Sequence, residues 1–250
     1  MKTSTKDALR AETVFIPGHG GDEIEAYLAQ SLAEGSHGSV VVLHHMPGYD
    51  EGTKEIARRF ASQGYIAVVP NLYSREAPDK SPEEASRIAR EQGGVPDERL
   101  VGDVDGAASF AKSLDSSNGK VAVIGYCSGG RQAFLAACSL DLDAAVDCYG
   151  GFVVKTPPAE MPLHVKPVAD KAKDLSCPLL GLFGAEDAFP APDEVADLDR
   201  ILTEAGKEHD FHTFEGAGHG FFGADGDMFR PAAAREGWSI IWDFFHRHLE

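Results

Sequence analysis

Basic residues and cysteines are scarce in this sequence of 250 residues. Lys and Arg together number 23 against 40 Asp and Glu, which gives a net charge of −17. A surface this acidic repels phosphate backbones and anionic lipid, so we expect neither a nucleic-acid partner nor a membrane role. There is no C-x-x-C pair, and a chain of this length does not need disulfides to fold. We therefore expect a cytoplasmic protein with reduced thiols at its four cysteines, Cys127, Cys138, Cys148 and Cys177.

Long apolar runs and metal-binding motifs are also missing. No stretch approaches the roughly 20 apolar residues that a membrane-spanning helix needs. The N-terminal residues MKTSTKDALRAE are polar and lack the apolar core of a signal peptide. No H-E-x-x-H motif and no spacing typical of metal ligands occurs. The segment GHGGDE at 18–23 lacks the helix and the Lys-Ser/Thr of a phosphate-binding loop, so we interpret it as a hairpin turn.

What the sequence does contain is a regular alternation of strand and helix patterns. Apolar runs rich in β-branched residues, such as SVVVLH at 39–44, are typical of strands buried on both faces. The alternation predicts one α/β domain over 1–250, with a mostly parallel central sheet, helices on both faces, an N-terminal antiparallel hairpin and a flexible segment at 1–11. Ligands of such sheets bind at the carboxyl ends of the strands. The predicted strands are 13–16, 24–30, 39–44, 65–70, 120–124, 143–148, 178–183 and 209–214, and the predicted helices are 51–63, 82–91, 97–114, 128–139, 192–205 and 237–249.

The sharpest motif is GYCSGG at 125–130, which directly follows the strand KVAVI and directly precedes a helical pattern. This is the G-x-nucleophile-x-G arrangement of a nucleophile elbow, with Cys127 as the nucleophile. Glycines on both sides allow the backbone to turn sharply without a Cβ clash, and the helix N-terminus favours a thiolate. Two alternatives stay open: Cys127 is a small buried apolar residue, or the neighbouring Ser128 attacks instead.

A nucleophile of this kind needs a base and a group that orients the base. Asp187 in GAEDAFP and His219 in GAGHGFF each follow a predicted strand, so both lie at the strand ends, as Cys127 does. The chain order nucleophile, acid, histidine is the order expected for an elbow on this kind of sheet. Glu186 is the rival for the acid. An oxyanion hole needs two N–H donors, which we assign to Ser128 and to Met46 in the loop after SVVVLH, because Pro47 has no N–H.

With these residues in view, the sequence resembles the dienelactone hydrolase family, which consists of carboxymethylenebutenolidase-like α/β-hydrolases. The resemblance begins near residue 12 and runs through nearly the whole chain. It implies the α/β-hydrolase fold, a Cys127–His219–Asp187 triad, no metal or organic cofactor, and hydrolysis of an enol lactone or related ester. The segments that carry it are HMPG at 45–48, PNLYSREAP at 70–78, VGDVDGAASF at 101–110, SNGKVAVIGYCSGG at 117–130, AVDCYGG at 145–151, GAEDAFP at 184–190 and EGAGHGF at 215–221.

Two departures from the family pattern bear on the substrate and on the thiol. The resemblance implies a glutamate that activates the thiol at the position of His45. A cationic His45 would stabilise a resting thiolate instead, or His45 only lines the pocket or bonds a neighbouring carbonyl. The resemblance also implies an arginine for a substrate carboxylate near Gly223, where none stands. We expect the substrate pocket to include His45, Tyr126, Cys148, Tyr149 and Phe221.

The predicted reaction is hydrolysis of an activated ester or lactone, a small molecule, through a cysteine acyl-enzyme. Acyl transfer, attack on another electrophile such as a phosphotriester, and ligand binding without catalysis are the alternatives. We expect a monomer or a small homo-oligomer.

Overall fold

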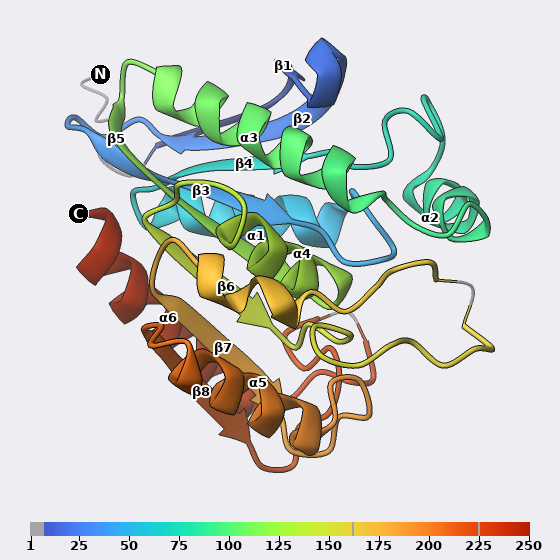
Figure 1. Cartoon of the computed structure of the whole chain (residues 1–250). Coiled ribbons are helices and arrows are strands. Elements are labelled where there is room, and N and C mark those ends of the chain that lie inside the picture. Colours follow the sequence, from blue (N-terminus) through green and yellow to red (C-terminus); the bar gives the residue numbers. More distant parts are fainter. Residues whose placement is uncertain (1–7, 162, 225) are drawn as a thin grey trace.

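The computed structural model describes residues 8–161, 163–224 and 226–250, and a single eight-stranded sheet runs through them (Figure 1). The strand order is β1-β2-β4-β3-β5-β6-β7-β8. β1 pairs antiparallel with β2, β2 pairs antiparallel with β4, and all later pairings are parallel. The strands are β1 (Leu9–Pro17), β2 (Glu23–Ser31), β3 (His37–Leu43), β4 (Ile66–Pro70), β5 (Ser117–Tyr126), β6 (Ala144–Cys148), β7 (Leu179–Gly184) and β8 (His209–Phe214).

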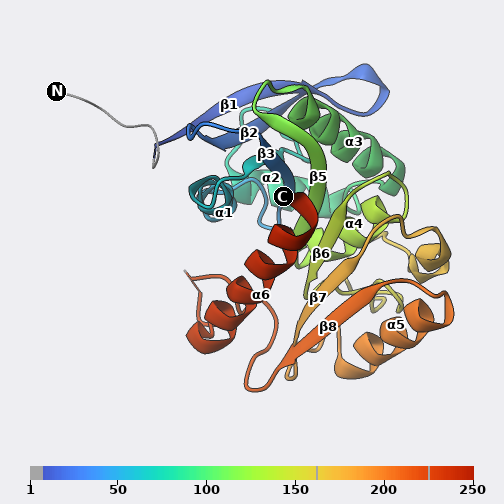
Figure 2. The same ribbon diagram turned by 90° about the vertical axis from the view of Figure 1, so that its left-hand side faces the viewer.

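Helices cover both faces of this sheet (Figure 2). α1 and α6 lie on one face, and α3, α4 and α5 lie on the other. Two short 3-10 segments stand apart from these helices, one in the β1–β2 turn and one before β7. The helices are α1 (Glu51–Ser62), α2 (Pro82–Glu91), α3 (Asp97–Ser113), α4 (Ser128–Ala137), α5 (Pro192–Glu204) and α6 (Pro231–Leu249), and the 3-10 segments are His19–Gly21 and Ala169–Asp174.

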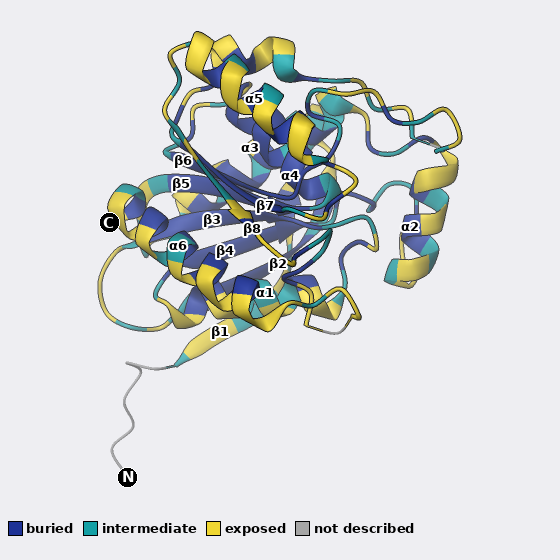
Figure 3. Ribbon diagram, turned by 90° about the horizontal axis from the view of Figure 1, so that it is seen from below, coloured by how far each residue is buried: buried dark blue, intermediate teal, exposed yellow. Residues whose placement is uncertain are grey.

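The central strands are buried because each contributes apolar side chains to two separate cores. In β3, Val41 and Leu43 face the α3/α4 side, whereas Val40 and Val42 face the α1/α6 side. None of these four side chains is exposed. Figure 3 shows the result, with dark-blue strands between helices whose outer surfaces are yellow. The apolar runs in the sequence are continuous because these strands are buried on both faces, as expected for a parallel sheet covered by helices.

The largest corrections to the predicted boundaries are at the two ends of the chain. Residues 1–7 of the predicted flexible segment lie outside the described residues, but Leu9–Ala11 belong to β1, where Leu9 pairs with Ser31 and Ala11 with Ala29. The last helix begins at Pro231 rather than at Gly237. Proline is favoured in the first turn of a helix, and the alanines that follow are strong helix formers.

The parallel strands all end at the same edge of the sheet. The loops after β3, β5, β6, β7 and β8 lie there, and the connections containing α2 and residues 149–168 extend beyond them at the right of Figure 1. The segments that carry Met46, Cys127, Asp187 and His219 are four of these loops or their continuations. The topology thus brings together residues that are far apart in the sequence.

Candidate active site

Cys127 stands at a sharp turn between β5 and α4. Its backbone has φ 57° and ψ −120°, a strained conformation for a residue with a side chain. The turn is held by two backbone hydrogen bonds: the Cys127 N–H donates to the Cys148 carbonyl at 3.0 Å, and the Cys127 carbonyl accepts from the Gly130 N–H at 2.9 Å. Cys127 is also the N-cap residue of α4, at the end of the helix where the dipole favours a negative charge.

Two glycines of the motif are required by the close packing of this turn. A Cβ on Gly125 would collide with the Gly129 carbonyl, and a Cβ on Gly129 would collide with the Leu43 carbonyl of β3. Both obstacles are backbone atoms, which cannot rotate away as a side chain can. The strand, the turn and α4 are therefore locked together only when both positions lack a side chain.

His219 and Asp187 form a hydrogen-bonded pair across the ends of β7 and β8. The His219 Nδ1 donates to Asp187 Oδ2 at 2.9 Å, and the other oxygen of this carboxylate accepts from the Phe189 N–H at 2.8 Å. Asp187 is only 5% exposed, so its carboxylate is held in one orientation. Glu186, the rival acid, is not hydrogen bonded to the histidine among the described contacts. The geometry thus pairs His219 with the residue that the sequence favoured.

Charge at the site favours a protonated His219. Burial lowers the pKa of His219, but hydrogen bonds to Asp187 and Cys127 and the charges of both groups outweigh burial and raise that pKa to about 10. The imidazole is therefore cationic at neutral pH. The ring of Tyr149 packs edge-on against the imidazole of His219, with ring centroids 5.2 Å apart, and helps to hold the imidazole in position.

The loop after β3 is held by two side chains that sequence reasoning missed. The His44 Nδ1 donates to the His45 carbonyl at 2.9 Å, while its Nε2 accepts from the Leu72 N–H at 3.3 Å. The Tyr73 hydroxyl donates to the Met46 carbonyl at 3.0 Å. His44 is 2% exposed, and burial is the main cause that lowers its pKa to about 4, so the ring is neutral.

This bonding pattern fixes the direction of the Met46 N–H. The His45 carbonyl and the Met46 N–H belong to the same planar trans peptide and point in opposite directions. His44 and the Gly48 N–H, which donates to the same carbonyl at 2.9 Å, hold the carbonyl on one side and so turn the Met46 N–H to the other. Met46 and Ser128 both line the cavity that contains Cys127. The Ser128 N–H is at the first position of α4, where helix geometry provides no backbone acceptor.

The cavity beside Cys127 has a volume of about 550 Å³. Its walls contain all three predicted triad residues and both predicted oxyanion donors, together with an apolar surface that the sequence did not reveal. The remaining lining residues are Tyr73, Gly94, Val95, Arg131, Gln132, Gly151, Phe152, Met161, Leu163, Val165, Glu186, Ala188 and Phe189.

Four of the five predicted pocket residues do not line the cavity. They are at most 4% exposed and belong to the core on the α1/α6 side of the sheet. Tyr126 and Cys148 end β5 and β6, and strand alternation directs them to that face of the sheet. Tyr149 and Phe221 lie in the loops after β6 and β8, and their rings pack against each other in the same core, with centroids 5.3 Å apart. The four are Tyr126, Cys148, Tyr149 and Phe221.

His45, the fifth predicted pocket residue, is turned toward α1. Its Nε2 lies 2.7 Å from Asp50 Oδ2, and it is not among the residues that line the cavity. Asp50 is the N-cap of α1 and accepts the Thr53 N–H at 2.8 Å. The structure therefore joins His45 to a helix cap, and does not bring it to Cys127.

Neither a metal site nor a membrane span is found in the part of the chain that the structure describes. No cluster of three or more His, Cys, Asp and Glu residues is arranged to hold a metal ion there. None of the described helices is both long and apolar enough to cross a membrane.

Nearly the whole chain is similar to one family of hydrolases. The model of the "Dienelactone hydrolase family" matches residues 24–249. "Putative carboxymethylenebutenolidase" of Methylorubrum extorquens is 33% identical over 97% of this chain and 82% of its own length. The protein of the same name from Yersinia pestis is 32% identical over 91% and 85%. The crystal structure of a "Putative Dienelactone Hydrolase" from Klebsiella pneumoniae superimposes with a TM-score of 0.84 at 29% identity, covering 96% of this chain and 99% of that one.

Proposed function

This chain belongs to the dienelactone hydrolase family, hydrolases of esters and lactones, and from that membership we propose that it cleaves an activated ester or enol lactone through a cysteine acyl-enzyme. The observation that carries the proposal is the meeting of Cys127 with the His219–Asp187 pair on the wall of one cavity. A nucleophile, a base and an acid that orients the base are the groups that covalent acyl transfer requires.

In the first half of the proposed reaction, the Cys127 thiolate attacks the carbonyl carbon. The developing oxyanion accepts hydrogen bonds from the N–H groups of Ser128 and Met46. As the tetrahedral intermediate collapses, the C–O bond to the leaving group breaks and His219 donates its proton to the departing oxygen. The product of this half is a thioester on Cys127 and a free alcohol or enol.

In the second half, neutral His219 takes a proton from water, and the resulting hydroxide attacks the thioester carbon. The C–S bond breaks, the carboxylic acid leaves, and the thiolate–imidazolium pair is restored. Asp187 keeps the imidazole oriented and stabilises its charged form in both halves. An enolate or phenolate leaves more readily than an alkoxide, which competes poorly with expulsion of the thiolate. The proposed substrates are therefore activated esters and enol lactones.

A reduced Cys127 is essential to this mechanism. All four cysteines are free in the structure, and a reducing cytoplasm would keep them so. We accordingly place the proposed reaction in the cytoplasm.

The test combines substitution with direct detection of the acyl-enzyme. Cys127→Ala should abolish hydrolysis of p-nitrophenyl acetate, whereas Cys138→Ala, at a buried cysteine outside the cavity, should retain it. Mass spectrometry of quenched wild-type enzyme should show one acetyl group on Cys127. Hydrolysis that survives in Cys127→Ala would overturn the proposal. Product analysis with added alcohols distinguishes a hydrolase from an acyltransferase, which would yield mainly the new ester.

A further inference from the structure

A large part of the cavity wall is apolar. Residues from the α2–α3 connection, the loop after β6 and the loop after β7 build this wall, and we call it the apolar wall. Burial of hydrocarbon against such a surface is favourable, while burial of an unpaired charge is costly. The apolar wall consists of Val95, Phe152, Met161, Leu163, Val165 and Phe189.

The one arginine that lines the cavity is already neutralised. Both terminal nitrogens of Arg131 donate to the Asp97 carboxylate, at 2.9 and 3.0 Å, and one of them also donates to the Lys166 carbonyl at 2.6 Å. Arg131 is 3% exposed, and its Nε, which has no hydrogen-bond partner, is buried too. The guanidinium therefore cannot turn toward a ligand without breaking its bonds to Asp97 and Lys166. Glu186 adds a negative charge to the lining. Apart from His219, the described lining thus offers no uncommitted cation to a substrate carboxylate.

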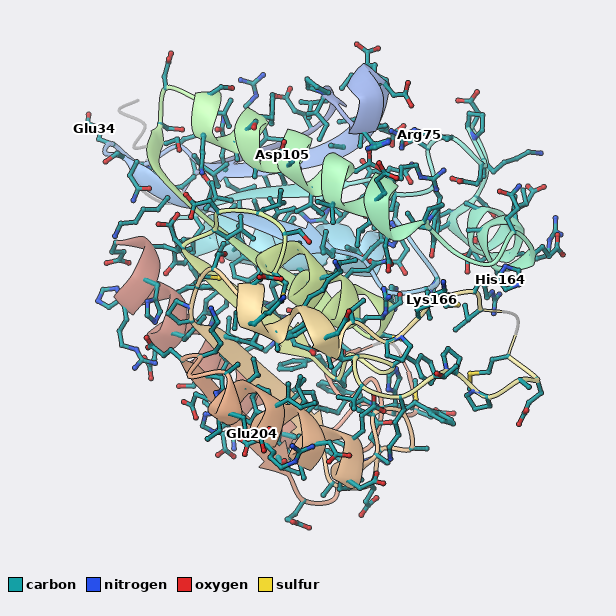
Figure 4. All side chains as sticks on the ribbon, in the orientation of Figure 1. Glu34, Arg75, Asp105, His164, Lys166 and Glu204 are labelled. Atoms are coloured by element: carbon teal, nitrogen blue, oxygen red, sulfur yellow. The ribbon has the colours of Figure 1, made fainter. Side chains whose placement is uncertain are left out.

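Hydrogen bonds to its neighbours preform the apolar wall. The Lys166 carbonyl is bound by Arg131, and the His164 N–H donates to the Gly93 carbonyl at 3.0 Å. Figure 4 shows His164 and Lys166 on the loop that extends beside α2. At the base of this loop, the Val168 N–H donates to the Val153 carbonyl at 2.8 Å. The apolar wall is therefore braced in place before any ligand arrives.

We propose that the substrate is a neutral ester or lactone whose apolar arm fills this cavity, and that the enzyme selects against a free carboxylate on that arm. This inference rests on the proposed function, because it concerns the substrate of the same site. A buried carboxylate would meet the hydrocarbon of the apolar wall and the negative charge of Glu186, and the lining would offer it no free cation. Each methylene added to the apolar arm should raise kcat/KM by up to about fourfold until the cavity is full.

The experiment compares two esters of equal length and equal leaving group. p-Nitrophenyl hexanoate ends in a methyl group, and mono-p-nitrophenyl adipate ends in a carboxylate. Wild-type enzyme should prefer hexanoate by about tenfold or more in kcat/KM, because a buried ion without partners is strongly disfavoured. Leu163→Arg should reduce or reverse this preference by supplying a free cation. Leu163→Met, which nearly conserves side-chain volume, should keep it.

The possible outcomes distinguish failure of the neutral-substrate inference from failure of the proposed hydrolase function. Hydrolysis that depends on Cys127 but is equal or faster with adipate would overturn the neutral-substrate inference and leave the proposed function intact. Hydrolysis of either ester that persists in Cys127→Ala, or no hydrolysis at all, would overturn the function and the inference with it. The rate of Cys127 alkylation by iodoacetamide in the Leu163 variants checks that the site remains assembled.

Discussion

A single carboxylate, that of Asp187, accounts for much of the chemistry expected of His219. Its hydrogen bond is among the causes that outweigh burial and raise the pKa of the imidazole to about 10. A histidine with a raised pKa is protonated below that value and loses its proton as the pH rises through it. The proton that the leaving group needs is therefore present at neutral pH and lost only in alkali.

We predict that Asp187→Asn shifts the alkaline limb of the pH–rate profile. In the wild type, kcat/KM for an ester should fall as the pH rises toward about 10, when His219 deprotonates. Without the carboxylate the limb should move to lower pH by at least about one unit, and the rate at pH 7 should fall about a hundredfold or more. Glu186→Gln should leave the position of the limb unchanged. A limb that moves in Glu186→Gln and stays in Asp187→Asn would reassign the acid.

A second residue, His44, positions the proposed oxyanion donor without touching the substrate. His44 and the Gly48 N–H both bind the carbonyl of the peptide that carries the Met46 N–H, so loss of His44 should loosen that donor even though the Gly48 bond remains. We predict that His44→Ala lowers kcat for ester hydrolysis about 10–100-fold, somewhat less than outright loss of an oxyanion donor. Alkylation of Cys127 by iodoacetamide forms no oxyanion and should proceed at the wild-type rate. An equal loss in both reactions would indicate general damage instead.

The neighbouring His45 is the natural comparison for this experiment. Its ring is bonded to Asp50 and lies outside the cavity lining. His45→Ala should therefore leave the alkylation rate and its pH dependence close to those of the wild type. Slower alkylation in this variant would restore the hypothesis, raised from the sequence, that a cationic His45 stabilises the thiolate.

Among the elements, the junction of β5, α4 and β3 depends most on small residues. We predict that Gly129→Ala destabilises the fold by about 1–3 kcal/mol, as is usual for overpacking, because the new methyl group would meet backbone of β3. It should also abolish hydrolysis by moving Cys127 away from His219. Gly52→Ala, the same change in the first turn of α1, should be neutral or slightly stabilising. Urea unfolding measured on both variants decides whether the junction has the proposed role.

Local signals explain which elements could be predicted from the sequence. The α/β-hydrolase fold is confirmed. It could be predicted because a strand buried on both faces and a nucleophile elbow each leave a signal within a few consecutive residues, as SVVVLH and GYCSGG illustrate.

The features that were missed depend on longer-range contacts. The apolar wall was missed because Leu163 and Val165 lie in an irregular loop, where apolar residues follow no period. The face on which Tyr126 and Cys148 lie depends on strand register, which the motif alone does not determine. His44 was missed because its role comes from a hydrogen bond to Leu72, distant in sequence.

For the whole molecule, the net charge of −17 opposes folding through mutual repulsion of surface carboxylates. Salt screens that repulsion over about 10 Å at 0.1 M ionic strength. We predict that adding about 0.5 M NaCl at pH 7 raises the Tm by about 2–4 °C, equivalent to about 1 kcal/mol for a protein of this size. Near pH 4.9, where the net charge approaches zero, the same salt should have little effect. A Tm that rises equally at both pH values would point to general salting-out rather than charge screening.

The braced loop that carries the apolar wall has a consequence for the evolution of this enzyme. Its ends are joined by the Val153–Val168 hydrogen bond, and its far part is tethered through Arg131 and Gly93, whereas Cys127, Asp187 and His219 stand on other connections. Mutations between residues 154 and 167 can therefore alter substrate preference without disturbing the chemical machinery. A lineage could exchange this loop by insertion, deletion or recombination and acquire new substrates in few steps. Selection would then act on preference and on reactivity as two nearly independent traits.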